Sequence, residues 1–177
     1  LYDYDKPLFH HLHLTEESAN RIGMHGKPEA YYFPPQYNCS YLGRFPLTYF
    51  GFDPSTKKEE VMECLRNYDI KDNRITELSR AYRIQIGTGW YTPPGVIHAP
   101  ASLVTYEPQW NSDVNTIMEN VTMGEVNPHN LLTDCIPEEE KDDLDAIFAQ
   151  IDWEESTRPD YKETYFRPPK VRCESEE

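Results

Sequence analysis

The sequence has few glycines, few basic residues and no long apolar run. Only 8 of its 177 residues are glycine, and 17 lysines and arginines stand against 31 aspartates and glutamates, for a net charge of −14. A chain this acidic is poorly suited to the phosphates of nucleic acid or to an anionic membrane surface. No stretch of about 18 apolar residues is present, so no transmembrane helix is expected. We therefore predict neither a nucleic-acid partner nor a membrane partner.

Cysteine is also scarce. Cys39, Cys64, Cys135 and Cys173 are widely spaced and form no C-x-x-C pair. Reduced thiols in the cytoplasm are the simplest interpretation of such a pattern. The first residues lack the basic start and apolar core of a signal peptide. The chain does not begin with Met, so the sequence leaves a removed signal peptide open beside the predicted cytoplasmic location.

Tyrosine and proline, by contrast, are abundant, at 13 and 15 residues. Short runs with alternating or β-prone residues, bounded by Gly and Pro turns, predict strands. These runs cover residues 9–14, 29–33, 47–52, 75–86, 89–92, 96–106 and 114–122. The sequence therefore predicts a fold dominated by β-structure, either a barrel or a sandwich.

Two segments show helical spacing instead. Val61, Leu65 and Tyr68 predict a helix inserted at about residues 55–68, where Thr56 and Glu59 have the spacing of a capping box. An apolar stripe predicts a second helix over residues 137–151. We expect residues 1–125 to form the main β-domain, and residues 126–177 to add a C-terminal helix and an extended polar tail that pack on it.

One segment carries a family resemblance. Gly87, Pro93, Gly95 and His98 match the spacing of G-x5-P-x-G-x2-H-x3-N, the second motif of the cupin family, and only the final position departs, being Ser102. The sequence thus resembles a cupin, which implies a double-stranded β-helix, or jelly-roll barrel. In cupins this His is one of usually four metal ligands, so the resemblance implies the same role for His98. A buried His without metal, bonded to Tyr, is the alternative.

The first cupin motif, G-x5-H-x-H-x3-4-E-x6-G, is matched much less well. One register uses His11, His13 and Glu17; a second uses His25 and Glu29, with a glycine in place of the first His. A third combines His11 and His13 on one strand with Glu29 at the start of the next. We favour the third, because two ligands on one strand must share a face. His25 remains a competitor for either imidazole.

The resemblance also implies a substrate cavity inside the barrel. Tyr106 would share the inward face of its strand with His98, and Arg83 would hold a carboxylate or sugar hydroxyls if it points inward; we predict catalytic roles for both. Tyr31, Trp90 and Tyr91 are the candidate substrate-binding rings. The alternative for each ring is an ordinary place in the core, and for Arg83 an exposed position.

Three His and one carboxylate would bind one divalent transition metal, and this ligand set suits Mn, Fe, Ni, Zn or Cu. Open positions on such an ion could bind a hydroxy-carbonyl compound and favour proton transfer. The main hypothesis is therefore a metal-dependent isomerase or lyase acting on a sugar or related small molecule. An iron-dependent dioxygenase and a non-catalytic small-molecule-binding cupin are the alternatives. Cupins often pair through their sheets, so the resemblance also implies a possible homodimer.

Overall fold

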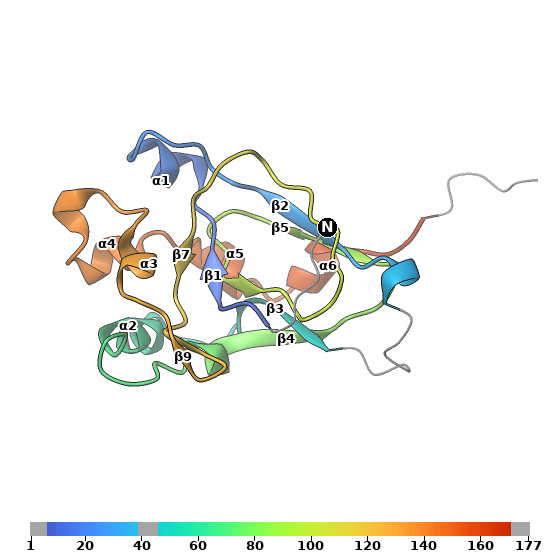
Figure 1. The fold of residues 1–177 in the computed structure, drawn as a ribbon, viewed down its shortest axis with the longest axis horizontal. Coiled ribbons are helices and arrows are strands. Elements are labelled where there is room, and N and C mark those ends of the chain that lie inside the picture. Colours follow the sequence, from blue (N-terminus) through green and yellow to red (C-terminus); the bar gives the residue numbers. More distant parts are fainter. Residues whose placement is uncertain (1–6, 39–45, 171–177) are drawn as a thin grey trace, which may run out of the picture.

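The fold is carried by antiparallel sheets. A computed structural model describes residues 7–38 and 46–170 (Figure 1). The largest sheet has five strands in the order β4-β3-β6-β1-β7. These strands are β1 (His11–Leu12), β3 (Leu47–Phe52), β4 (Ser79–Arg83), β6 (His98–Ala99) and β7 (Thr116–Ile117). The short β1 lies between β6 and the edge strand β7 and pairs with both.

A second sheet lies opposite the first in Figure 1. It contains β10 (Phe166–Arg167), β5 (Gly89–Thr92) and β2 (Glu29–Tyr32), in that order. A separate hairpin joins β8 (Val121–Thr122) to β9 (Glu125–Val126). The fold is thus rich in sheet, as predicted. Closure of the sheets into a complete barrel stays a prediction, as does the domain boundary after residue 125.

The predicted strand over residues 96–106 is much shorter in the structure. Only His98 and Ala99 are in β6, where they pair with β1 on one side and β3 on the other. The next residue, Pro100, has no N–H to donate to a neighbouring strand, so the ladder ends there. Residues 75–86 differ as well, because a 3₁₀ turn over Ile75–Leu78 precedes β4.

The inserted helix is α2 (Lys58–Arg66), which buries Val61 and Leu65 as the helical spacing predicts. It begins later than expected because the cap lies one residue further on. The Glu60 carboxylate accepts a hydrogen bond of 2.8 Å from the backbone N–H of Lys57. The other helices are short: α1 (Glu16–Asn20), α3 (Asn130–Thr133), α4 (Leu144–Phe148), α5 (Trp153–Thr157) and α6 (Tyr161–Tyr165).

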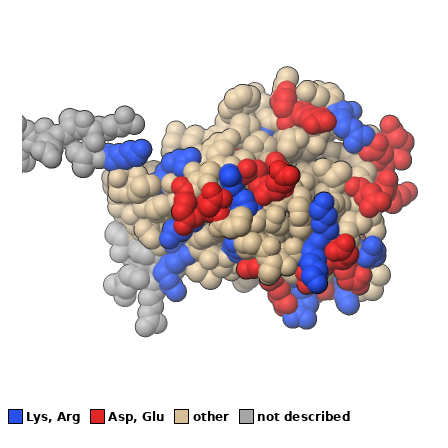
Figure 2. All heavy atoms as spheres, turned by 180° about the vertical axis from the view of Figure 1, so that it is seen from behind, with Lys and Arg blue, Asp and Glu red and all other residues tan. Residues whose placement is uncertain are grey.

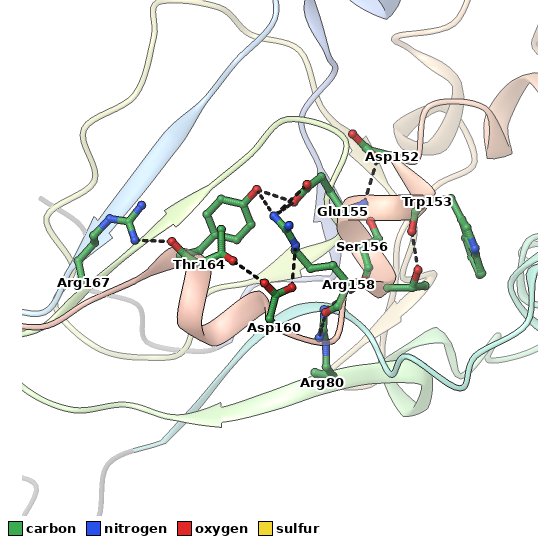
Figure 3. Close-up of polar contacts among 11 residues, drawn as sticks. Arg80, Asp152, Trp153, Glu155, Ser156, Arg158, Asp160, Thr164 and Arg167 are labelled. Atoms are coloured by element: carbon green, nitrogen blue, oxygen red, sulfur yellow. Dashed lines mark hydrogen bonds and ion pairs between the residues drawn. The ribbon is translucent and has the colours of Figure 1, made fainter.

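Residues 126–170 contain more regular secondary structure than predicted. The expected helix over residues 137–151 is split into a 3₁₀ turn at Glu138–Glu140 and α4. The expected polar tail contains α5, α6 and β10. Arg158 bonds Glu155 and Asp160 within this segment, and Arg80 donates to the backbone carbonyls of Ser156 and Arg158 at 3.1 and 2.6 Å (Figure 3). These contacts fasten the tail to β4.

Two apolar clusters fill the molecule. One packs α2, α4 and the Leu12–Leu14 side of β1 together. The other is aromatic and lies between the two sheets, where Phe50 stacks on Trp90 with 5.0 Å between ring centroids. Tyr161 of α6 is fully buried in this second cluster, which explains why the tail is ordered.

The surface carries charges of both signs, and two of the four cysteines lie in the described part of the chain. Acidic and basic side chains are interspersed over the face in Figure 2. Cys64 and Cys135 are free thiols, whereas Cys39 and Cys173 lie outside the described residues. Within residues 7–38 and 46–170, no helix has both the length and the apolar character needed to cross a bilayer.

Candidate metal centre

Three histidines from two paired strands meet in the interior. His11 lies directly opposite His98 in the β1–β6 register, and His13 is on the same face of the chain as His11. The ring centroids of His11 and His98 are 4.3 Å apart, and His13 lies 5.1 and 5.3 Å from these two rings. One nitrogen atom from each ring lies within 4.8 Å of the others. All three side chains are buried.

Main-chain carbonyls orient the three rings. Nδ1 of His11 lies 2.9 Å from the oxygen of Phe9, Nδ1 of His13 lies 2.8 Å from that of Val114, and Nδ1 of His98 lies 2.8 Å from that of Val96. Because a carbonyl oxygen can only accept, each Nδ1 carries a proton and donates it. In a neutral ring, Nε2 then keeps its lone pair, which is the state that a metal requires.

Glu29 of β2 completes the cluster from the opposite sheet. Its Oε2 lies 3.0 Å from Nε2 of His13, and its Oε1 lies 3.0 Å from Nε2 of His98. The Tyr31 hydroxyl donates a hydrogen bond of 2.6 Å to Oε1. Glu29 is 2% exposed, so its carboxylate depends on these neighbours for its charge balance.

The surroundings disfavour a charge on His11 and His13 and favour an ionised Glu29. Burial lowers the pKa of both His11 and His13, and His98 nearby lowers it further. Burial by itself would raise the pKa of Glu29, but His13 and His98 hold it well below its usual range. Oε2 of Glu29 and Nε2 of His98 have no hydrogen-bond partner in the described part of the chain. Buried polar atoms without a hydrogen bond, in a cluster of three imidazoles and a carboxylate, fit a bound cation.

The cupin-like turn positions this cluster. Gly95 has φ of +80°, which favours glycine, and a Cβ there would lie 2.8 Å from Cβ of Asp152. Its N–H donates a hydrogen bond of 2.7 Å to the carbonyl oxygen of His13. The turn therefore connects His13, which directly follows β1, to the segment that leads into His98.

Glu29, His11, His13 and His98 are thus the predicted ligands that the structure brings together. It places His25 elsewhere, on the surface, where Nδ1 lies 3.0 Å from Oε1 of Glu16 and the side chain is 78% exposed. Glu17 is also exposed, on α1.

The predicted catalytic residues do not lie at the cluster. Tyr106 is 53% exposed and forms an isolated bridge with Tyr32; it cannot share a strand face with His98, because that strand ends at Ala99. Arg83 is exposed on β4, opposite Leu47. The inward position expected for Tyr106 is therefore wrong, whereas Arg83 has the exposed position that the sequence analysis gave as its alternative.

The three candidate substrate rings fall in different places. Tyr31 bonds Glu29 directly. Trp90 is buried in the aromatic cluster between the sheets, as the alternative interpretation of a core ring expected. Tyr91 is half-buried and packs against Tyr165, with 5.8 Å between ring centroids.

A small cavity at the cluster reveals residues that the sequence reasoning missed. It has a volume of about 150 Å³, and Lys27, Glu107 and Asn115 line it together with His11 and His13. Burial, together with the negative charge of Glu29, raises the pKa of Glu107 to about 7. Glu107 follows Tyr106 in an irregular segment, where no spacing in the sequence points to it. Lys27 could have been found more easily, because it lies two residues before Glu29.

Comparison with known proteins supports the cupin-like fold. No protein-family model and no curated protein matches the sequence. Among solved structures, mannose 6-phosphate isomerase from Bacillus subtilis is 20% identical with a TM-score of 0.55, and the match covers 77% of this chain and 42% of that one.

Two further matches are more distant in sequence. A variant of phosphomannose isomerase from Salmonella typhimurium is 11% identical, with a TM-score of 0.51 and coverage of 86% and 52%. A mannose 6-phosphate isomerase bound with zinc and yttrium is also 11% identical, with a TM-score of 0.51 and coverage of 86% and 53%. The chain therefore spans about half the length of these proteins, and the likeness concerns the fold.

Proposed function

We propose that this chain is a metal-dependent cupin that isomerises a sugar. The convergence of three buried imidazoles and the Glu29 carboxylate is the observation that carries the proposal. The similar solved structures named above are mannose 6-phosphate isomerases, which favours a carbohydrate over the dioxygenase alternative.

In this proposal His11, His13, His98 and Glu29 hold one divalent metal. Zinc is the first ion to test, since it is named in one of the similar structures and accepts nitrogen and oxygen ligands. When bound, such an ion polarises a carbonyl group and makes the neighbouring C–H more acidic.

The chain's own groups would orient the site and move the proton. Tyr31 holds Glu29 through its hydroxyl, and the carbonyls of Phe9, Val96 and Val114 hold the rings. Glu107 lines the cavity beside His11 and His13. We assign Glu107 to take the proton from C2 of an aldose and return it to C1, while the hydroxyl proton on O2 passes through water to O1, so that C2 becomes the carbonyl carbon of a ketose.

Metal analysis and product analysis test this proposal together. Protein loaded with zinc should bind one ion per chain and interconvert an aldose and a ketose from a panel of sugars and sugar phosphates, followed by NMR. Glu107→Gln should keep the metal and lose the conversion, while Glu29→Gln should lose both. Zinc-free protein that converts sugars equally well would contradict the proposal, as would zinc-loaded protein that converts none of the panel.

A further inference from the structure

Trp110 is the most exposed of the three tryptophans in the chain. Its side chain is 65% exposed, whereas Trp90 is buried and Trp153 packs against the first apolar cluster. A single exposed apolar residue needs no explanation by itself. What distinguishes Trp110 is its position beside the candidate metal centre and the cavities on either side of it.

The segment before Trp110 runs along the strand that carries Glu29. Gln109 forms an isolated bridge with Glu29, and the N–H of Ala30 donates a hydrogen bond of 3.0 Å to the oxygen of Pro108. The N–H of Trp110 donates to the oxygen of Pro28 at 3.3 Å. The indole is therefore held on an anchored segment, one residue beyond the backbone partner of Glu29.

Trp110 is a common wall of two surface cavities. One has a volume of about 520 Å³ and the other about 420 Å³. Lys27 lines the larger of these and also the cavity of about 150 Å³ at the histidines. Small-molecule sites usually have volumes of about 300–1,000 Å³. The cavity at the histidines is too small by this measure, whereas the cavity beside Trp110, which shares Lys27 with it, lies within this range.

The groups around the larger cavity suit hydroxyl-bearing ligands. Besides Trp110 and Lys27 it is lined by Gln109, Asn111 and Asp113, whose amide and carboxylate groups bond hydroxyls well. A nucleotide could also stack on an indole, but its phosphates would meet one cation, Lys27, and one carboxylate in this cavity. The chemistry therefore favours a sugar ring, whose C–H face packs on an aromatic surface while its hydroxyls bond the rim.

We propose that Trp110 is a stacking platform for a second sugar ring of the substrate, so that the substrate is a reducing disaccharide or a longer reducing sugar. This inference rests on the proposed function, because it places the reducing end in the cavity at the histidines. The second ring lies against the indole, in the cavity that shares Lys27.

The signals of the indole N–H groups in a ¹H–¹⁵N NMR spectrum of the full chain test the platform. The probes are maltose, cellobiose, lactose and mannobiose, with glucose and mannose for comparison. Trp110→Phe identifies the signal of Trp110 by its loss. We expect at least one disaccharide to shift this signal, and to bind about 10-fold more tightly than its monosaccharide.

Two variants separate stacking from general damage. Trp110→Ala should weaken disaccharide binding about 10-fold, while Trp110→Phe, which keeps a ring, should stay within about threefold. Zinc content should be the same in both variants and in the unchanged protein. The proposal is overturned if none of the six sugars moves the Trp110 signal, or if Trp110→Ala binds the disaccharide as tightly as the unchanged protein.

The platform and the proposed function can fail separately. The unchanged protein could bind no zinc while a disaccharide still shifts the Trp110 signal and binds more weakly to Trp110→Ala. That result would support the stacking site and contradict the metal-dependent function. If zinc binds and a sugar is isomerised while all disaccharides leave Trp110 unmoved, the platform is refuted and the function stands.

Discussion

Buried glutamates contact histidines on both faces of the segment around β1, and the two sites use different ring nitrogens. His10 places Nδ1 2.9 Å from Oε2 of Glu119, and the same oxygen accepts the backbone N–H of His10 at 2.7 Å. On the other face, His13 and His98 turn Nε2 toward Glu29, because their Nδ1 atoms already donate hydrogen bonds to carbonyl oxygens.

The difference shows how a fold makes a metal site from common side chains. At His10 the carboxylate serves as an acceptor for two N–H groups, so the contact is a structural tie between β1 and the segment after β7. At Glu29 the rings present Nε2 instead, the nitrogen whose lone pair a metal would take, because Nδ1 of each ring donates to a carbonyl oxygen. Among the described residues, His11, His13 and His98 form the one group of His, Cys, Asp or Glu side chains with metal-binding spacing.

The largest expected effect is the loss of zinc in His98→Ala. Replacement of groups that only orient a metal ligand costs about 10–100-fold in affinity, so removal of a ligand should cost more than about 100-fold. Competition against a chromophoric chelator measures the affinity. His10→Gln is the matched control, since His10 is equally buried on the opposite face and should leave zinc binding unchanged. Equal losses of zinc affinity in both variants would show that the two sites do not differ in metal binding.

The next effect is on stability. Glu119→Leu removes the acceptor of two buried N–H groups, which should lower the free energy of unfolding by about 2–3 kcal/mol. Glu119→Gln keeps an acceptor and should lose less. Urea denaturation measures both, and zinc affinity should be unaffected in either variant. A loss of zinc in Glu119→Leu that exceeds its effect on folding would show that the two faces are coupled.

The third effect is a pH dependence of the metal-free protein. Because burial lowers the pKa of His11 and His13, the unfolded chain binds more protons below its ordinary His pKa of about 6.5. The free energy of unfolding should therefore fall as the pH drops from about 6.5 toward the folded-state values, by at most about 1.4 kcal/mol per pH unit for each ring. Denaturation at several pH values checks this, and His13→Asn should show a shallower fall. An identical pH dependence in the two proteins would speak against a neutral, buried His13.

The smallest effect concerns the hydroxyl that holds Glu29. Tyr31→Phe removes the donor to Oε1 and should weaken zinc binding about 10-fold without removing a ligand. Tyr91→Phe, one strand away and packed on Tyr165, is the control and should change nothing. Unchanged zinc affinity in Tyr31→Phe would mean that the histidines orient Glu29 without help from the tyrosine.

Local patterns predicted part of this site and part of the fold well. The strand over residues 89–92 and the one over 47–52 have the predicted bounds, since Gly and Pro turns or β-prone runs mark them clearly. The choice of Glu29 over Glu17 as the companion of His11 and His13 agrees with their convergence. His25 and Tyr106 were misplaced because spacing along the chain does not show where a loop leaves the sheet.

The C-terminal segment shows where prediction from composition fails. Its polar composition predicted an extended tail, yet Tyr161 packs against Phe50 with 6.0 Å between ring centroids. One buried ring and the contacts of Arg80 order a segment whose own residues give weak helical signals. Composition averages over the segment and misses a single large side chain that is buried.

The sequence by itself determined the elements that depend on neighbours in the chain: the Gly95 turn, the alternation that puts His11 and His13 on one face, and the position of Glu29 at the start of a strand. Only the tertiary structure decided which nitrogen each histidine presents, and that Glu107 and Lys27 share the cavity. Those outcomes depend on carbonyl groups and carboxylates that come from distant strands, and no local spacing encodes where such strands meet.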